Sequence, residues 1–228
     1  MIKLIIFDWD DVFTHGSIEG YYAVVHETLK ALGVELDRDE EIRRIKVKWG
    51  STLPIQFEEL LKEKPELIGR AVDKYTELLM SDVFVGQLTL VEGSVELIKR
   101  LFTKYKLAIA SGTNPDVLRQ RVFPKFSIPN LFSEIITVYD LENPLHAKPH
   151  AFMAEEIMRR RDIKPSETVL VGDANNDVSM ALNAGVTPIV VLTGHLNREQ
   201  SEEMGVKYII DDVTKLEEVL DRLNQSAS

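Results

Sequence analysis

Short, wholly apolar segments alternate with helical patterns through most of this chain. The apolar segments cover residues 4–7, 107–110, 135–138, 168–171 and 186–192, and turn-forming residues bound each one. Helical patterns over residues 94–105 and 149–161 separate the later segments. Strands that are apolar on both faces are typical of parallel sheets covered by helices on both sides. The pattern therefore predicts a doubly wound, mainly parallel α/β core.

Three sites in the later part of the chain carry helix-start signals. Pro115 and Pro149 each stand where a first helical turn would begin, and Asn114 suits the N-cap before Pro115. Thr214 and Glu217 have the spacing of a capping box and predict the start of the last helix.

The first connection of the core is far too long for a loop. Residues 15–90 contain helical patterns near 22–32, 39–49, 56–63 and 66–80, and they contain no convincing strand. A parallel crossover needs only about a dozen residues. We therefore expect a core domain over residues 1–14 and 91–228, with an inserted α-helical domain over residues 15–90.

Composition excludes several classes of function. The chain has 228 residues, a formal net charge of −10 and no cysteine. The acidic balance argues against broad binding to nucleic acid or to an anionic membrane, and the lack of cysteine removes thiolate chemistry. The apolar segments are too short for a signal-peptide core or a transmembrane helix, so we expect a cytoplasmic protein, monomeric or a small homo-oligomer. A phosphorylated substrate remains compatible, because a metal or a few local cations can reverse the sign inside a pocket.

Polar side chains with catalytic potential follow the predicted strands. In a doubly wound sheet, ligands bind outside the carboxyl ends of the strands, so these side chains should meet at one edge. Clustered carboxylates repel one another unless a cation lies among them. The candidates are Asp8 and Asp10 after the first strand, Ser111 and Gly112 after the second, Lys148 before a helix, and Asp173 and Asp177 after the fourth.

Each candidate also has a purely structural interpretation. An aspartate after a strand is commonly a turn or capping residue, a serine a turn hydroxyl, and a lysine a solvated charge. Asn175 and Asn176 could support a metal or cap the following helix. It is the order and placement of the candidates together that favours chemistry.

Four segments resemble the ordered motifs of the haloacid dehalogenase superfamily. They are FDWDDVFT, SGTN, AKP and GDANND, and they match DxDx(T/V), a strand-ending Ser or Thr, a Lys, and GDxxxD, over residues 4 to about 192. The long helical insertion and the segment VEGSVELIKRL are similar to the α-capped, phosphoglycolate phosphatase-like branch. The resemblance implies a Rossmann-like core with a helical cap and a phosphatase acting on a small phosphorylated metabolite.

The resemblance also implies a role for each candidate residue. Asp8 would be the nucleophile that forms an aspartyl-phosphate, and Asp10 the general acid and base. Mg²⁺ would be held by Asp8, Asp173 and the backbone carbonyl of Asp10, with Asp177 supporting or joining that set. Ser111, Gly112 and Lys148 would bind the phosphoryl oxygens.

The chain departs from the family pattern at three positions. Asp11 stands where glycine is usual, so the turn there is expected to differ, and its simplest role is solvent-facing or capping. Val12 replaces the commoner Thr. His15 stands where Asp or Asn is frequent, and either a substrate or hinge role or an ordinary linker role is open for it.

Other functions stay open at this point. A phosphomutase of the β-phosphoglucomutase type shares the motifs, and a non-catalytic regulatory protein could retain the fold. A 2-haloacid dehalogenase is disfavoured because Asp10 is present, and a phosphonate hydrolase would need a cap lysine, for which Lys46 or Lys48 are candidates. Specificity is expected from residues 48–57 and from Arg43 and Arg44. Helix packing for Trp49 and Phe57, and a solvated face for the arginines, are the structural alternatives.

Overall fold

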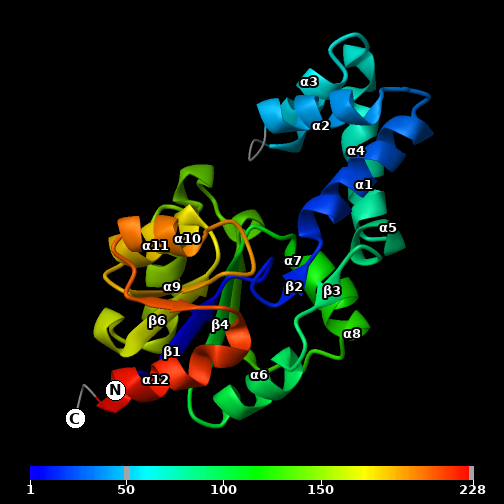
Figure 1. Ribbon diagram of the computed structural model, residues 1–228. Helices are drawn as coiled ribbons and strands as arrows, with labels where there is room; N and C mark the ends of the chain where they lie inside the picture. Colours follow the sequence, from blue (N-terminus) through cyan, green and yellow to red (C-terminus); the bar gives the residue numbers. More distant parts are fainter. Residues whose placement is uncertain (49–51, 226–228) are drawn as a thin grey trace. The chain divides into compact units, whose positions relative to one another are not determined.

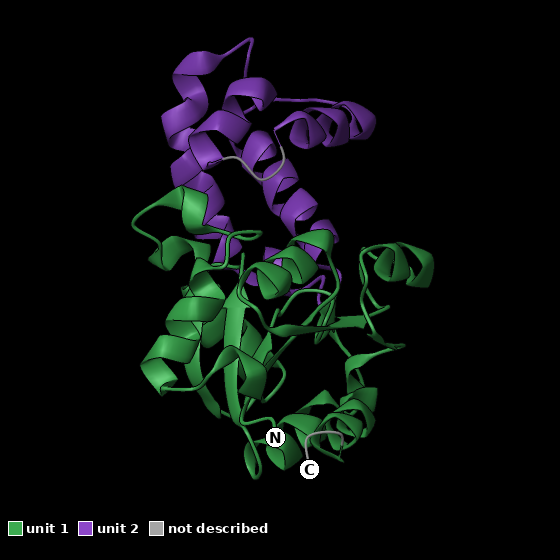
Figure 2. Ribbon diagram, turned by 90° about the vertical axis from the view of Figure 1, so that its left-hand side faces the viewer, with its two compact units in different colours: residues 1–15, 89–228 green, residues 16–88 purple. Residues whose placement is uncertain are grey.

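The chain folds as two compact units. The computed structural model describes residues 1–48 and 52–225; one unit comprises residues 1–15 and 89–228 and the other residues 16–88 (Figure 2). Trp49 lies outside the described residues.

A six-stranded parallel sheet forms the centre of the first unit (Figure 1). Its strands are β1 (Leu4–Phe7), β4 (Lys106–Ser111), β5 (Phe132–Thr137), β6 (Thr168–Gly172), β7 (Thr187–Val191) and β8 (Tyr208–Ile210), in the order β5-β4-β1-β6-β7-β8. All five pairings are parallel. The predicted α/β, doubly wound parallel fold is therefore confirmed. Strand β8 was not predicted, because its three residues are too few to show a strand pattern.

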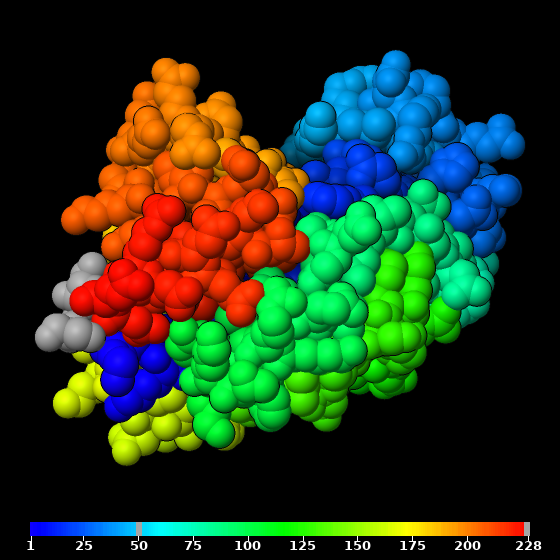
Figure 3. Space-filling model, turned by 60° about the horizontal axis from the view of Figure 1, so that its bottom comes forward, coloured from blue at the N-terminus to red at the C-terminus, as the bar shows by residue number. Residues whose placement is uncertain are grey.

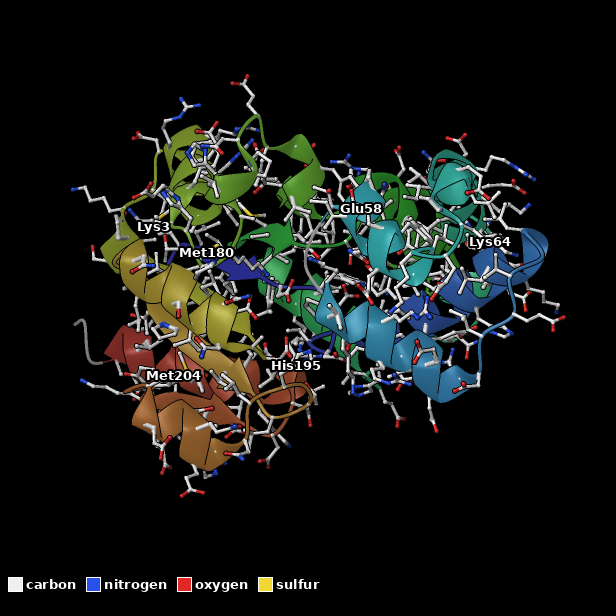
Figure 4. All side chains as sticks on the ribbon, turned by 90° about the horizontal axis from the view of Figure 1, so that it is seen from above. Lys3, Glu58, Lys64, Met180, His195 and Met204 are labelled. Carbon is white, nitrogen blue, oxygen red and sulfur yellow. The ribbon has the colours of Figure 1, made fainter. Side chains whose placement is uncertain are left out.

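The central strands are apolar because both faces of the sheet are covered. Successive side chains of a strand point to opposite faces. Leu4 and Ile6 share one face with residues of α9 (Phe152–Arg161) and α10 (Asn175–Asn183), among them Met180, which Figure 4 labels. Ile5 and Phe7 therefore point to the other face, and they are fully buried as well.

Helices α6 (Ser94–Phe102) and α12 (Leu216–Gln225) lie side by side. Arg100 Nη2 on α6 lies 2.8 Å from Glu217 Oε2 on α12. Figure 3 shows this neighbourhood, with the red C-terminal residues against green residues near 100 and blue residues near the N-terminus. The N–H group of Ile2 donates to Asn224 Oδ1 at 2.7 Å, so α12 also holds the segment that leads into β1.

A two-residue antiparallel ribbon lies where the chain leaves and re-enters the first unit. It pairs β2 (Thr14–His15) with β3 (Thr89–Leu90), and His15 faces Thr89 in its register. No strand was expected between residues 15 and 90, so β3 corrects that interpretation. A two-residue strand is too short to show an alternating pattern.

The second unit is helical. Its longer helices are α1 (Ser17–Ala31), α2 (Arg38–Val47), α3 (Leu53–Leu60), α4 (Ile68–Leu79) and α5 (Asp82–Val85). Phe57 is buried against Tyr75, with ring centroids 5.9 Å apart, so the helix-packing interpretation of Phe57 is confirmed. A Cβ on Gly20 would come within 2.7 Å of the Phe84 ring, so this glycine lets α1 and α5 pack closely.

Arg44 is not on a solvated face. It is buried, and its guanidinium lies 2.5 Å from Glu40 Oε1 and 2.7 Å from Glu63 Oε2. It also donates to the carbonyl of Leu60 at 3.2 Å. Arg43, one residue earlier, is exposed and pairs only with Glu40 in the contacts described. Consecutive residues lie about 100° apart around a helix axis, so one of these neighbours is buried while the other is exposed.

One of the three helix starts predicted from the sequence is confirmed. Asn114 caps α7 (Pro115–Val117), where its Oδ1 accepts from the N–H groups of Asp116 and Val117. Pro149 does not begin α9, which starts three residues later at Phe152. Thr214 and Glu217 do not form the capping box, because Asp212 accepts from the N–H of Thr214 and Glu217 pairs with Arg100.

Short helical turns complete the described chain. They are α8 (Phe123–Lys125), α11 (Arg198–Glu203), a π-helical turn at Leu118–Val122, and 3₁₀ turns at Pro65–Leu67, Val138–Asp140, Pro144–His146, Pro165–Glu167 and Val213–Lys215. None of the helices in the described ranges combines the length and apolar character that a membrane span requires.

Candidate active site

The first acids lie at the point where the strand order reverses. From β1 the chain goes first to β4 on one side and later to β6 on the other. Ligands bind at such a point, outside the carboxyl ends of the strands. Asp8 follows β1 directly, and its N–H donates to the carbonyl of Val171 on β6 at 2.8 Å. Asp173 follows β6, so the two acids leave neighbouring strands at the same edge.

Lys148 lies between two of the carboxylates. Its Nζ is 2.8 Å from Asp8 Oδ1 and 2.7 Å from Asp177 Oδ1. Burial alone would lower the pKa of this ammonium, but the neighbouring charges of Asp177 and Asp8 outweigh it and raise the pKa. The lysine therefore stays charged, and the surface interpretation of Lys148 does not hold.

Three carboxylates converge beside this lysine. Asp8, Asp173 and Asp177 each offer an oxygen within 4.8 Å of the others. Burial, followed by the charges of Asp177 and Asp10, raises the pKa of Asp8 to about 7 against the opposing charge of Lys148. Burial, followed by the charges of Asp8 and Asp177, raises the pKa of Asp173 to about 8. Buried carboxylates at this spacing fit a hard divalent cation, which takes oxygen ligands and favours the ionised acids.

Backbone groups fix the orientation of the two later acids. Asp177 Oδ2 accepts from the N–H of Asp173 at 3.3 Å and of Ala174 at 3.1 Å, so Asp177 also caps the start of α10. Asp173 Oδ2 accepts from the N–H of His195 at 3.0 Å. Asn175 and Asn176 are the first residues of α10 and neither is its N-cap.

Two glycines allow the backbone to approach these acids. A Cβ on Gly172 would lie 2.3 Å from Cβ of Asp177, and one on Gly194 would lie 1.9 Å from Oδ2 of Asp173. Any larger residue must displace the acid that it faces. Gly172 belongs to the recognised GDxxxD motif, whereas nothing in the sequence marked Gly194.

The other two candidate groups come from the end of β4, the strand next to β1. Ser111 is fully buried at that strand end, and its Oγ accepts from the N–H of Thr113 at 3.1 Å. Beside it, Gly112 is open, because a Cβ there would meet no atom within 4 Å. The hydroxyl of Thr113 donates to Asp10 Oδ2. Asp10 therefore contacts the loop that follows β4.

The loop after β7 contributes residues that the sequence analysis missed. Thr193 Oγ1 donates to the carbonyl of Asp11, and His195 forms a second possible ligand group with Asp11 and Asp173. Figure 4 labels His195 on this loop, ahead of α11. Asp11 takes the left-handed conformation (φ 55°), which replaces the usual glycine turn. Asp8 was predicted because ligands bind outside the carboxyl ends of parallel strands. The same strand-end rule, applied to the loop after β7, could have identified His195.

Comparison with known proteins decides the family. The sequence matches the haloacid dehalogenase-like hydrolase family over residues 2–185.

The chain belongs to the haloacid dehalogenase-like hydrolase family.

Curated relatives of this hydrolase are phosphatases with different substrates. Glyceraldehyde 3-phosphate phosphatase of Methanothermobacter thermautotrophicus is 28% identical over 237 residues, which cover 96% of this chain and all of that protein. Phosphoserine phosphatase of Methanocaldococcus jannaschii is 26% identical, over 81% of this chain and 83% of that protein. Pyrophosphatase PpaX of Bacillus mycoides is 30% identical over 97 residues, 42% of this chain and less than half (44%) of that relative. The two phosphatases that match over most of their length, together with the family, support phosphoric monoester hydrolysis as the enzyme's reaction class.

Solved structures share the fold. A haloacid dehalogenase-like hydrolase from Streptococcus pneumoniae aligns with a TM-score of 0.72 at 20% identity, covering 96% of this chain and 98% of the other. A predicted phosphoglycolate phosphatase from Haemophilus somnus aligns with a TM-score of 0.74 at 18% identity, covering 96% and 98%. The resemblance read from the four motifs is confirmed at the level of family and fold.

Proposed function

We propose that this chain is a Mg²⁺-dependent phosphatase that hydrolyses a small phosphorylated metabolite through an aspartyl-phosphate on Asp8. One observation carries the proposal: the buried Lys148 contacts both Asp8 and Asp177, beside Asp173. The carboxylates can bind a cation, and the ammonium beside them can bind a phosphoryl oxygen. A turn with a purely structural role requires no buried charges of either sign.

Asp8 acts as the nucleophile. Its carboxylate attacks phosphorus, a bond forms between Oδ and phosphorus, and the bond from phosphorus to the leaving oxygen breaks. Attack requires the ionised form, and the adjacent ammonium of Lys148 favours that form. Lys148 at the same time lies where it can bind a phosphoryl oxygen as charge develops there.

Asp10 moves the protons. It gives a proton to the leaving oxygen in the first step. In the second it takes a proton from the attacking water, whose oxygen bonds to phosphorus while the bond from phosphorus to Asp8 Oδ breaks and phosphate is released. The hydroxyl of Ser111 and the N–H of Gly112 bind the remaining phosphoryl oxygens. Gly112 suits this role because no side chain screens its backbone.

Asp8, Asp173 and Asp177, with the backbone carbonyl of Asp10, are the groups that would hold Mg²⁺. When bound, the ion would neutralise the acids and the phosphate and would polarise the phosphoryl group. The residues fit the ion because all three side-chain donors are carboxylate oxygens. Burial and mutual repulsion raise the pKa values of Asp8 and Asp173, and a bound cation would lower both by favouring the ionised acids.

The helical unit of residues 16–88 is proposed to act as the cap that selects the substrate. A phosphomutase would need a second phosphate-binding locus there, made of available cationic side chains. Arg44 does not supply one, because Glu40, Glu63 and the carbonyl of Leu60 occupy its guanidinium. This favours transfer of the phosphoryl group to water.

A phosphate-release screen tests the proposal. Purified protein is incubated with a panel of phosphorylated metabolites, including glyceraldehyde 3-phosphate, phosphoserine, phosphoglycolate, sugar monophosphates and pyrophosphate, with Mg²⁺ or with EDTA. We expect release from at least one compound with Mg²⁺, none with EDTA, and none from the Asp8→Asn variant. Full activity in EDTA would contradict the metal dependence. Isomer formation from a sugar monophosphate and its bisphosphate, many-fold faster than phosphate release, would replace phosphatase by mutase.

A further inference from the structure

Thr113 contacts Asp10 across two neighbouring strand ends. Its Oγ1 donates a hydrogen bond to Asp10 Oδ2, and its side chain is almost completely buried, with 1% of the residue exposed. We infer that Thr113 is a positioning residue that holds the carboxyl of Asp10 for proton transfer. The inference rests on the proposed function, which gives Asp10 the acid–base role.

Thr113 is itself held firmly. Its N–H donates to Ser111 Oγ at 3.1 Å, and the next residue, Asn114, caps α7 by accepting from the N–H of Asp116 at 2.9 Å. The backbone of Thr113 is thus fixed between a strand end and a capped helix. A β-branched side chain has few χ1 rotamers, so fixing the position of the Thr113 hydroxyl costs little conformational entropy. The donor that meets Asp10 is preorganised.

The contact determines how Asp10 presents its two oxygens. Because the hydroxyl of Thr113 donates to Oδ2, a proton on that oxygen would compete with the donor, and proton transfer falls to Oδ1. In the first step the O–H bond on Oδ1 breaks as the leaving oxygen gains the proton. In the second step Oδ1 takes a proton from the attacking water. A carboxyl free to rotate would present the wrong oxygen for part of the time.

The same residue also orients the phosphate-binding hydroxyl. The N–H of Thr113 occupies a lone pair of Ser111 Oγ, so the hydroxyl hydrogen of Ser111 remains to be donated to a phosphoryl oxygen. This backbone contact remains when Thr113 is replaced by Val or Ser, which keep the N–H group. Such a variant therefore tests the contact with Asp10 while Ser111 keeps its backbone donor.

Two aryl phosphates of similar shape test the inference. Phenol is a poor leaving group that needs a proton, whereas 4-nitrophenol leaves readily as the anion. We expect Thr113→Val to lower kcat/KM for phenyl phosphate by about 10- to 100-fold and for 4-nitrophenyl phosphate by less than about 3-fold. Thr113→Ser, which keeps the hydroxyl, should return both values to within about 3-fold of the original. The two kcat/KM values are compared within each variant. Partial unfolding would lower both values by the same factor and leave their ratio unchanged.

A double substitution shows whether Thr113 acts through Asp10. If it does, Thr113→Val should change kcat/KM by less than about 2-fold in an Asp10→Asn background, because the group that it positions is already gone. Equal losses on the two substrates, or a further loss in the Asp10→Asn background, would overturn the inference and leave the proposed function standing. If Asp10→Asn alone leaves phenyl phosphate hydrolysis unchanged, the acid–base role of Asp10 is wrong, and the inference fails with it.

Discussion

Lys148 Nζ lies 2.8 Å from Asp8 Oδ1 and 2.7 Å from Asp177 Oδ1, so one buried ammonium joins the end of β1 to the start of α10. The contact links the proposed nucleophile to the proposed metal site. Its removal should affect the reaction far more than the fold.

The Lys148→Ala variant should lose at least about 10²-fold in kcat. The ammonium is a preorganised charge at the reacting centre, and losing one such group costs about that factor. The measurement is steady-state phosphate release in saturating Mg²⁺. Lys104→Ala is the matched control, because Lys104 is exposed and should leave the rate unchanged. A near-normal kcat for Lys148→Ala would remove Lys148 from the reaction.

Asp8→Asn should lose at least about 10³-fold in kcat while it keeps the fold, since an amide oxygen cannot be phosphorylated in this way. Circular dichroism checks the fold, and mass spectrometry of the acid-quenched reaction detects the phosphorylated protein. The original protein should show a phosphorylated species on rapid acid quench, and the variant should show none. Turnover above one-tenth of the original would mean that another residue is the nucleophile.

Without metal, stability should fall as pH rises from about 5 to 8. The pKa values of Asp8 and Asp173 are raised in the folded chain to about 7 and about 8, so the folded state binds protons that the unfolded state has released. Each such proton contributes a slope of about 1.4 kcal/mol per pH unit. Thermal unfolding in EDTA measures the dependence, and Mg²⁺ should flatten it because the ion favours the ionised acids.

Asp173→Asn is the control for that experiment. It should reduce the slope in EDTA and abolish the rise in Tm that Mg²⁺ causes in the original protein. Asp39→Asn, at an exposed position, should change neither. An unchanged slope in Asp173→Asn would show that this carboxyl does not titrate in the window.

Gly194→Ala should weaken Mg²⁺ binding by about 10-fold or more and leave the fold intact. The added Cβ would stand 1.9 Å from Oδ2 of Asp173, so the carboxylate must move. Shifts in ligand-supporting contacts cost about 10- to 100-fold in metal affinity. The Mg²⁺ dependence of kcat measures the change. Gly69→Ala, where a Cβ meets no atom within 4 Å, should leave that dependence as it was.

Arg44→Ala should destabilise the chain by about 2–3 kcal/mol, whereas Arg43→Ala should cost no more than about 0.5 kcal/mol. The first loses several charged hydrogen bonds in a buried position, and the second loses an exposed ion pair. Urea unfolding monitored by circular dichroism separates the two. Equal effects would mean that the Arg44 network contributes no more than a surface pair.

The central strands and the acids that follow them were predictable from the sequence. Both faces of β1 and β6 are buried, so their residues are apolar without interruption, and the first polar residue marks the strand end. In a parallel sheet, all such ends lie on one edge. Local pattern therefore leads directly to Asp8 and Asp173.

The contacts that residues make between distant segments were not predictable, even where a strand-end rule can point to the residue itself. Thr113 reaches Asp10 and His195 reaches Asp173 only because separate strands end side by side. The capping box at Thr214 failed because a 3₁₀ turn, Val213–Lys215, precedes α12, and its N-cap is Asp212, which accepts from the N–H of Thr214. Pro149 failed because a proline in a loop looks the same in sequence as one at a helix start.

The ribbon of Thr14 and His15 with Thr89 and Leu90 has an evolutionary consequence. It joins the two ends of the insertion to each other before the inserted residues begin. The chain therefore leaves and re-enters the first unit through one paired base, whatever number of residues lies between. Closing a longer segment costs only a logarithmic increase in entropy. A lineage can thus exchange, lengthen or shorten the inserted helical unit while the strand that carries Asp8 is inherited unchanged.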